Sequence, residues 1–158
     1  MGKTRILLMG AGGYGAGYVR QLASAPPDAD WEWVGVADPY AARSPEWDRI
    51  AAAGVPVFDT PEAFYAASAA DLAVIVTPIP LHAPQCITAM EHGSDVLLEK
   101  PIAGSTETAK TIIDARDRLG RRLFLGYQWC YDPVMHRLKD AADRGDFGRP
   151  VRMRSLAG

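Results

Sequence analysis

A short apolar run that breaks into a glycine-rich turn constrains this chain more than any other feature. Residues 4–17 read TRILLMGAGGYGAG, and Gly10, Gly12 and Gly15 follow the spacing G-x-G-x-x-G ahead of a helical pattern. A second apolar run ends at Asp38. A strand, a glycine turn, a helix and an acid after the next strand are the parts of a dinucleotide-binding βαβ unit.

Each part of that unit has a physical task. Gly10 allows the tight turn, Gly12 lets the backbone approach a pyrophosphate, and Gly15 lets the helix pack closely on the strand. The helix N-terminus would direct N–H groups and the positive end of its dipole at the phosphates. Gly13 and Tyr14 lie inside the loop, where the Tyr14 ring either covers the pyrophosphate or packs against the sheet. The alternative is a glycine turn that binds no ligand.

The choice of cofactor depends on Asp38. Its carboxylate would accept hydrogen bonds from a ribose 2′-hydroxyl, and it would repel a 2′-phosphate about 4 Å away by several kcal/mol before screening. We therefore expect NAD, with NADP still possible because Arg43 lies close in sequence and would be able to reach a 2′-phosphate. The other interpretation of Arg43 is a solvated charge in a loop.

Composition excludes several classes of partner. The 158 residues are 48% hydrophobic and 23% charged, with a net charge of −2, so neither nucleic acid nor a membrane is an expected partner. No apolar run approaches the ~18 residues of a membrane span. Cys86 and Cys130 lack metal or redox spacing, and we expect both to be buried thiols in a reducing, cytoplasmic compartment. No His, Cys and carboxylate cluster predicts a metal site.

Strand and helix patterns alternate along most of the chain, which is typical of an α/β fold with a doubly wound parallel sheet (Rossmann). Ser44 and Thr60 each precede a proline, a pattern that predicts a helix N-cap. The expected strands are 5–9, 31–37, 55–58, 72–77, 95–98 and 122–125. The expected helices are 14–25, 44–53, 61–69, 81–92, 105–119 and 132–144.

The pattern changes after Gly126. A helix opened by Asp132 is followed by a turn and by a strand over 151–156 that has no partner in the sequence. We therefore expect a dinucleotide-binding domain over 1–128 and, over 129–158, the first pieces of a second α/β domain before which the chain is truncated. The alternative is a naturally short protein whose last strand pairs with another subunit.

Several motifs occur together in one order. They are GAGGYG at 10–15, VADP at 36–39, VIVTP at 74–78 with His82 four residues on, EKP at 99–101 and LGYQWCYDP at 125–133. With these motifs the chain resembles the N-terminal half of the glucose-fructose oxidoreductase / inositol dehydrogenase-like (Gfo/Idh/MocA) family. The resemblance implies an NAD(P)-dependent oxidoreductase of sugars, polyols or related carbonyl compounds. It also implies a second domain that carries further catalytic residues and makes a homo-oligomer.

The resemblance also assigns residues. Lys100 would be the catalytic residue, beside the nicotinamide and the reacting hydroxyl, where its charge polarises the oxygen or exchanges a proton. Thr77, Pro78 and Glu99 lie with it at strand ends, where ligands bind in a doubly wound sheet. The alternatives are a surface lysine for Lys100 and an ion pair with a neighbouring cation for Glu99.

Three further positions follow from the same resemblance. His82 would shape the cofactor pocket, although capping and helix packing explain it equally well. Gln128, with Tyr127, would line the nicotinamide side. A cis peptide before Pro101 would aim Lys100.

The function that we expect is therefore the NAD(P)-binding domain of a sugar or polyol dehydrogenase, inactive by itself. One rival is a non-catalytic regulator of the same fold that senses a dinucleotide. A second rival is an S-adenosylmethionine methyltransferase, which also uses a glycine loop and an acid after the second strand. Pro78 and the EKP motif argue against the methyltransferase.

Overall fold

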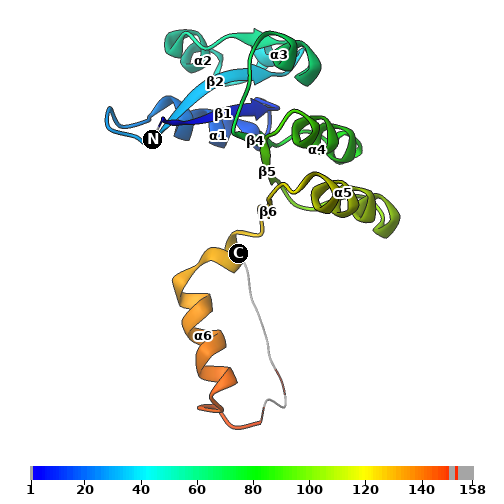
Figure 1. Cartoon of the computed structure of the whole chain (residues 1–158). Coiled ribbons are helices and arrows are strands. Elements are labelled where there is room, and N and C mark those ends of the chain that lie inside the picture. The colour runs from blue at the N-terminus through cyan, green and yellow to red at the C-terminus, as the bar shows by residue number, and fades with distance from the viewer. Residues whose placement is uncertain (1, 150–151, 153–158) are drawn as a thin grey trace. The chain divides into compact units, whose positions relative to one another are not determined.

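The computed structural model describes residues 2–149 and 152. Its central feature is a parallel sheet with the strand order β3-β2-β1-β4-β5-β6 (Figure 1). The strands are β1 (Thr4–Met9), β2 (Trp31–Ala37), β3 (Val57–Phe58), β4 (Leu72–Ile75), β5 (Asp95–Leu98) and β6 (Leu123–Leu125). This order is that of the Rossmann sheet, with a switch point between β1 and β4, and it confirms the predicted fold class.

Helices cover both faces of the sheet. They are α1 (Gly15–Ala23), α2 (Trp47–Ala53), α3 (Pro61–Ala67), α4 (His82–Glu91) and α5 (Thr106–Leu119). Successive side chains of β1 point to opposite faces, so Leu8 packs in a cluster with α1 and α2, whereas Leu7 packs in a cluster with α3, α4 and α5. Strands β1 and β4 are therefore buried on both sides, as their apolar sequences predict.

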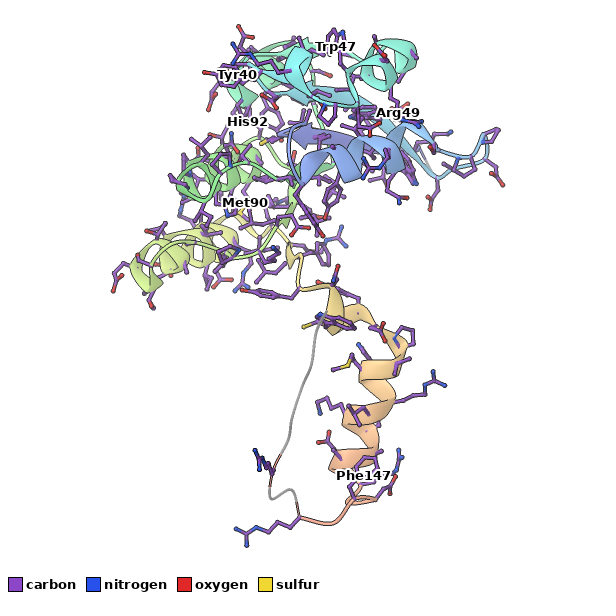
Figure 2. All side chains as sticks on the ribbon, turned by 180° about the vertical axis from the view of Figure 1, so that it is seen from behind. Tyr40, Trp47, Arg49, Met90, His92 and Phe147 are labelled. Carbon is purple, nitrogen blue, oxygen red and sulfur yellow. The ribbon has the colours of Figure 1, made fainter. Side chains whose placement is uncertain are left out.

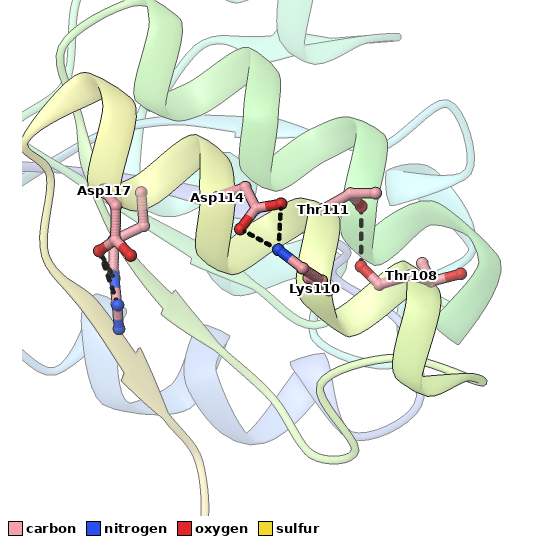
Figure 3. A network of polar contacts seen from close by, with 6 residues as sticks. Thr108, Lys110, Thr111, Asp114 and Asp117 are labelled. Atoms are coloured by element: carbon pink, nitrogen blue, oxygen red, sulfur yellow. Dashed lines mark hydrogen bonds and ion pairs between the residues drawn. The ribbon is translucent and has the colours of Figure 1, made fainter.

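Most helix ends follow local signals. The Thr60 hydroxyl accepts a hydrogen bond from the Ala63 N–H at 3.2 Å, as the predicted N-cap should. Helix α5 ends at Gly120, which adopts the left-handed conformation with φ 63°. The exposed surface of α5 carries the ion pair between Lys110 and Asp114 (Figure 3). Local sequence thus accounts for the start of α3 and the end of α5.

The predicted helix start at Ser44 is wrong. Helix α2 begins at Trp47 with Glu46 as its N-cap, and Ser44 instead follows a 3-10 turn, η1 (Ala41–Arg43). The Ser44 hydroxyl does accept a hydrogen bond from the Glu46 N–H at 3.2 Å, but the α-helix begins only at Trp47, and the same buried hydroxyl donates a hydrogen bond to the carbonyl oxygen of Ala11 at 2.7 Å. This bond ties the η1 region to the glycine loop.

The chain divides into two compact units, and the second begins at Tyr127. This second unit contains a 3-10 turn, η3 (Gln128–Tyr131), and helix α6 (Pro133–Asp143), which Asp132 caps by accepting hydrogen bonds from the next backbone N–H groups. Cys130 lies in η3 and is exposed, so the expectation that both cysteines are buried holds only for Cys86. The strand expected over 151–156 lies outside the described residues, except for residue 152.

Candidate cofactor site

A cavity of about 560 Å³ opens where β1, β2 and β4 end, beside the switch point of the sheet. Ligands bind at this place in doubly wound folds. The cavity brings together seven of the residues that the sequence nominated, namely Gly10, Gly12, Gly13, Tyr14, Asp38, Thr77 and Pro78. It also adds residues that sequence reasoning did not single out for the site, among them Tyr40, Ser44, Leu81 and Gln85.

The glycine loop is closed on one side and open on the other. A Cβ on Gly15 would lie 2.2 Å from the carbonyl oxygen of Gly10, so α1 approaches β1 as closely as the backbone allows. Gly10 has φ +90°, and a Cβ there would meet Thr77 at 3.0 Å. By contrast, a Cβ on Gly12 or Gly13 would have no heavy atom within 4 Å. The loop therefore faces the cavity with bare backbone.

The N-terminus of α1 adds positive potential at the same loop. This helix of nine residues has Tyr14 as its N-cap without a side-chain hydrogen bond, and its first turn holds no acidic residue. No side chain of its own first turn therefore offsets the positive end of the helix dipole. Such an end favours a bound anion, including a phosphate group.

Asp38 is fixed in place by the backbone. Its Oδ2 accepts a hydrogen bond from the Ala11 N–H at 2.8 Å, and its Oδ1 accepts one from the Tyr40 N–H at 2.8 Å. Since a carboxylate oxygen has two acceptor sites, both oxygens can accept a further donor from the cavity. The Ser44 hydroxyl donates to the Ala11 carbonyl oxygen, which belongs to the next peptide group, so both peptide groups that flank Ala11 are held. No local pattern indicates this bond, because Ser-Pro in a sequence matches a helix cap.

Arg43 and Tyr40 form part of the cavity wall next to Asp38. The Arg43 guanidinium lies 4.9 Å from the centre of the exposed Tyr40 ring, which Figure 2 labels. A cation at this distance over an aromatic face is attracted to it. The position of Arg43 is therefore that of a cavity residue, as the NADP alternative requires.

Glu99 is buried under the edge of the sheet and held by a residue that the sequence did not nominate. The Tyr18 hydroxyl donates a hydrogen bond to Glu99 Oε1 at 2.6 Å, and the Lys100 N–H donates to Oε2 at 3.1 Å. Burial, followed by the bond to Glu99, raises the pKa of Tyr18 above its ordinary value. A Cβ on Gly126 would lie 2.7 Å from the carboxyl group, so the Glu99 side chain can occupy this position only because residue 126 is glycine.

Lys100 follows β5 and is exposed, and its peptide bond to Pro101 is cis. Its Nζ lies 5.5 Å from the centre of the Tyr14 ring. That ring is 60% exposed and meets the Tyr18 ring edge-on, with 6.3 Å between the centroids. Tyr14 is therefore not packed against the sheet, and Lys100 lies beside the glycine loop at the carboxyl edge of the strands.

Four nominated residues of the Rossmann unit do not line the cavity, namely Gly15, His82, Glu99 and Lys100. His82 is the first residue of α4 and is 2% exposed, with both ring nitrogens directed at backbone carbonyl groups. Gln128 is exposed and belongs to η3 in the second unit. The described residues contain no group of three or more His, Cys, Asp or Glu arranged to hold a metal ion. Among them, no helix is long and apolar enough to cross a membrane.

Comparison with known proteins agrees with this geometry. Residues 4–127 match a family described as "Oxidoreductase family, NAD-binding Rossmann fold", with the label GFO_IDH_MocA. The chain belongs to this family. The resemblance that the motifs indicate is thereby confirmed, and the match covers the whole described cavity.

Individual relatives extend the comparison. An inositol 2-dehydrogenase from Streptomyces avermitilis is 34% identical over 150 residues, which are 94% of this chain and 43% of the relative. The WlbA dehydrogenase from Bordetella pertussis, solved in complex with NADH and UDP-GlcNAcA, is 31% identical with a TM-score of 0.80, covering 93% of this chain and 44% of the other. A myo-inositol 2-dehydrogenase from Lactobacillus plantarum shares the fold, with a TM-score of 0.80 and 22% identity over 93% of this chain and 43% of the other. The chain thus spans less than half the length of each.

Proposed function

We propose that this chain is the NAD-binding part of a dehydrogenase that acts on a sugar, a polyol or a related hydroxy or carbonyl compound. The observation that carries the proposal is a cavity at the switch point with bare glycine backbone, an α1 N-terminus without acid, and an anchored Asp38. The substrate class is supported by the inositol dehydrogenases and by the dehydrogenase solved with NADH and a UDP-sugar.

The residues fit the parts of a dinucleotide in sequence along the cavity. Gly12, Gly13 and the N-terminus of α1 would hold the pyrophosphate. Asp38 would accept hydrogen bonds from the adenosine ribose, as the acid of this fold does. Because a dinucleotide crosses the switch point, the nicotinamide half would extend toward β4 and β5, past Thr77 and toward Lys100.

The chemistry would then depend on Lys100. A bound nicotinamide supplies a carbon that accepts or returns a hydride. The Lys100 ammonium would hold the oxygen of the substrate and exchange a proton with it. Glu99 holds the Lys100 backbone through its N–H. We propose that turnover and oligomer formation need the second α/β domain that the family resemblance implies, with residues 127–158 leading into it.

Calorimetric titration of the folded chain with NADH and NADPH tests this proposal. We expect micromolar binding of NADH and binding of NADPH at least about tenfold weaker, because Asp38 repels the 2′-phosphate. Asp38→Asn removes the charge and keeps an acceptor for one of the two N–H groups. In this variant we expect the difference between the two cofactors to shrink.

Three results would contradict the proposal. A chain that is folded by circular dichroism and binds neither cofactor would show that the glycine loop serves structure only. Binding of S-adenosylmethionine in place of NADH would show the methyltransferase class instead. A protein that contains this chain and its second domain, and that binds NADH without turning over sugars or polyols, would point to a dinucleotide-sensing regulator.

A further inference from the structure

His82 contacts two separate loops at once. Its Nε2 lies 2.9 Å from the Thr77 carbonyl oxygen, and its Nδ1 lies 3.0 Å from the Pro101 and 3.3 Å from the Ile102 carbonyl oxygen. All of these partners are acceptors, so a ring nitrogen bonds to its carbonyl oxygen only by donating a hydrogen. A ring with one N–H donates to one loop and contacts the other, and a ring with two N–H groups donates to both. Because the side chain is 2% exposed, water cannot replace these carbonyl groups as hydrogen-bond partners of the ring.

These two loops have different tasks in the candidate site. Thr77 follows β4 and lines the cavity, whereas the Pro101–Ile102 segment follows Lys100. One imidazole therefore joins the cavity wall to the segment that carries the proposed catalytic lysine. We propose that His82 is a positioning residue that sets the spacing between these loops and holds Lys100 at the nicotinamide half of the cofactor. This inference rests on the proposed function.

The cavity wall has a second anchor that does not involve His82. The Thr77 hydroxyl donates a hydrogen bond to Gln85 Oε1 at 2.6 Å, one turn further along α4. The adenosine end of the cavity is held by bonds among Ala11, Asp38 and Ser44, all remote from His82 in sequence. Loss of the His82 ring should therefore affect the segment after Lys100 and leave the adenosine end in place.

That asymmetry makes a ligand comparison the decisive experiment. NADH and ADP-ribose share the adenosine and pyrophosphate, and only NADH carries the nicotinamide. For His82→Ala we expect NADH affinity to fall about tenfold and ADP-ribose affinity to change less than about twofold. His82→Gln retains a side-chain donor that can bond to one of the two loops, so it should recover part of the NADH affinity.

His92 provides the matched control. His92, labelled in Figure 2, follows the last residue of the same helix and is exposed. Its ring stacks on the Tyr65 ring. His92→Ala should bind both ligands as the wild-type chain does. An equal loss of both ligands in His82→Ala would mean general destabilisation and would overturn the proposal, and so would unchanged NADH binding.

The wild-type chain allows a test that does not need the variants to fold. Nuclear magnetic resonance should show a His82 ring N–H that exchanges with solvent much more slowly than that of His92, and NADH should slow it further than ADP-ribose does. Fast exchange of the His82 ring N–H in the ligand-free chain would contradict its hydrogen bonding to the two loops and would overturn the proposal, even if no dinucleotide binds. Failure of the wild-type chain to bind NADH would contradict the proposed function, whereas the exchange rate of the His82 N–H tests the role of His82 independently.

Discussion

The carboxyl edge of the sheet is held differently on its β2 side, which comprises Ala11, Asp38 and Ser44, and on its β5 side, which comprises Tyr18, His82, Glu99 and Lys100. The four β5-side residues lie outside the cavity lining. On the β2 side, the bonds to Ala11 join residues 27 and 33 positions apart, within the first βαβ unit. On the β5 side, Tyr18 and Glu99 are 81 positions apart. The β2 side can form with the first unit, whereas the β5 side needs the strands from β1 to β5 in register.

Because the two sides are held differently, we expect substitutions on them to have different effects. The β2 side rests on hydrogen bonds that involve the backbone of the glycine loop, so a lost side chain leaves most of the loop geometry in place. The β5 side rests on a buried carboxyl group that needs its hydroxyl donor, because an unpaired buried acceptor is costly. Substitutions on the β5 side should therefore change binding and stability more than those on the β2 side.

The largest effect is expected for Gly15→Ala, which should break both sides together. The added Cβ would lie 2.2 Å from the Gly10 carbonyl oxygen, so α1 has to move away from β1. We expect the free energy of unfolding to fall by about 1–3 kcal/mol and NADH binding to be lost, as measured by urea unfolding and calorimetry.

Gly17→Ala is the control for that change. Its Cβ would lie 3.8 Å from the Arg20 side chain, and alanine favours a helix over glycine by up to about 1 kcal/mol. Stability should therefore be unchanged or higher. A Gly15→Ala chain as stable as Gly17→Ala would contradict the close packing of α1 on β1.

The next effect is expected for Tyr18→Phe, which acts on the β5 side alone. The change leaves Glu99 Oε1 without the hydroxyl donor seen at 2.6 Å. We expect a loss of about 1–3 kcal/mol in the free energy of unfolding and weaker binding of NADH than of ADP-ribose relative to the wild-type chain. Tyr40→Phe, at an exposed ring, should not change stability. Equal stability of the two variants would contradict the proposal that the Tyr18 hydroxyl stabilises the buried Glu99 carboxyl group.

A smaller effect is expected for Ser44→Ala on the β2 side. It removes the neutral hydrogen bond to the Ala11 carbonyl oxygen, which costs about 1 kcal/mol, and the longer bond from the Glu46 N–H at 3.2 Å. Because Asp38 still holds the Ala11 N–H, ADP-ribose should bind nearly as before. If Ser44→Ala costs more than Tyr18→Phe in urea unfolding, the ranking of the two sides is reversed.

The smallest effect is expected from alkaline pH. The pKa of Tyr18 is raised on folding above the value of 10.0 that it has when unfolded. Above pH 10 the unfolded chain therefore loses a proton that the folded chain keeps, so stability falls as the pH rises. Tyr18→Phe should show a shallower fall. Tyr65, whose pKa burial raises to about 12, contributes equally to both chains. The measurement is the free energy of unfolding against pH for the wild-type chain and for Tyr18→Phe. Parallel curves for the two chains would contradict a raised pKa of Tyr18.

The same contrast explains what sequence reasoning found and what it missed. The order of strands and helices, the glycine loop, Asp38 and the caps at Thr60 and Gly120 are recognisable because each depends on spacing within a few residues. The helix expected from Ser44 begins at Trp47 instead, and the bond from the Ser44 hydroxyl to Ala11 spans 33 positions, which no local pattern indicates.

The contacts on the β5 side came only from the tertiary structure, although the resemblance had nominated His82, Glu99 and Lys100. Nothing local marks Tyr18 as the partner of Glu99 or shows that the two nitrogens of His82 face the loop after β4 and the segment after Lys100. Period-2 burial and turn chemistry act over a few residues, so they can be read directly from the chain. A hydrogen bond across the sheet depends on how α1, β4 and β5 pack, and that packing exists only in the folded protein.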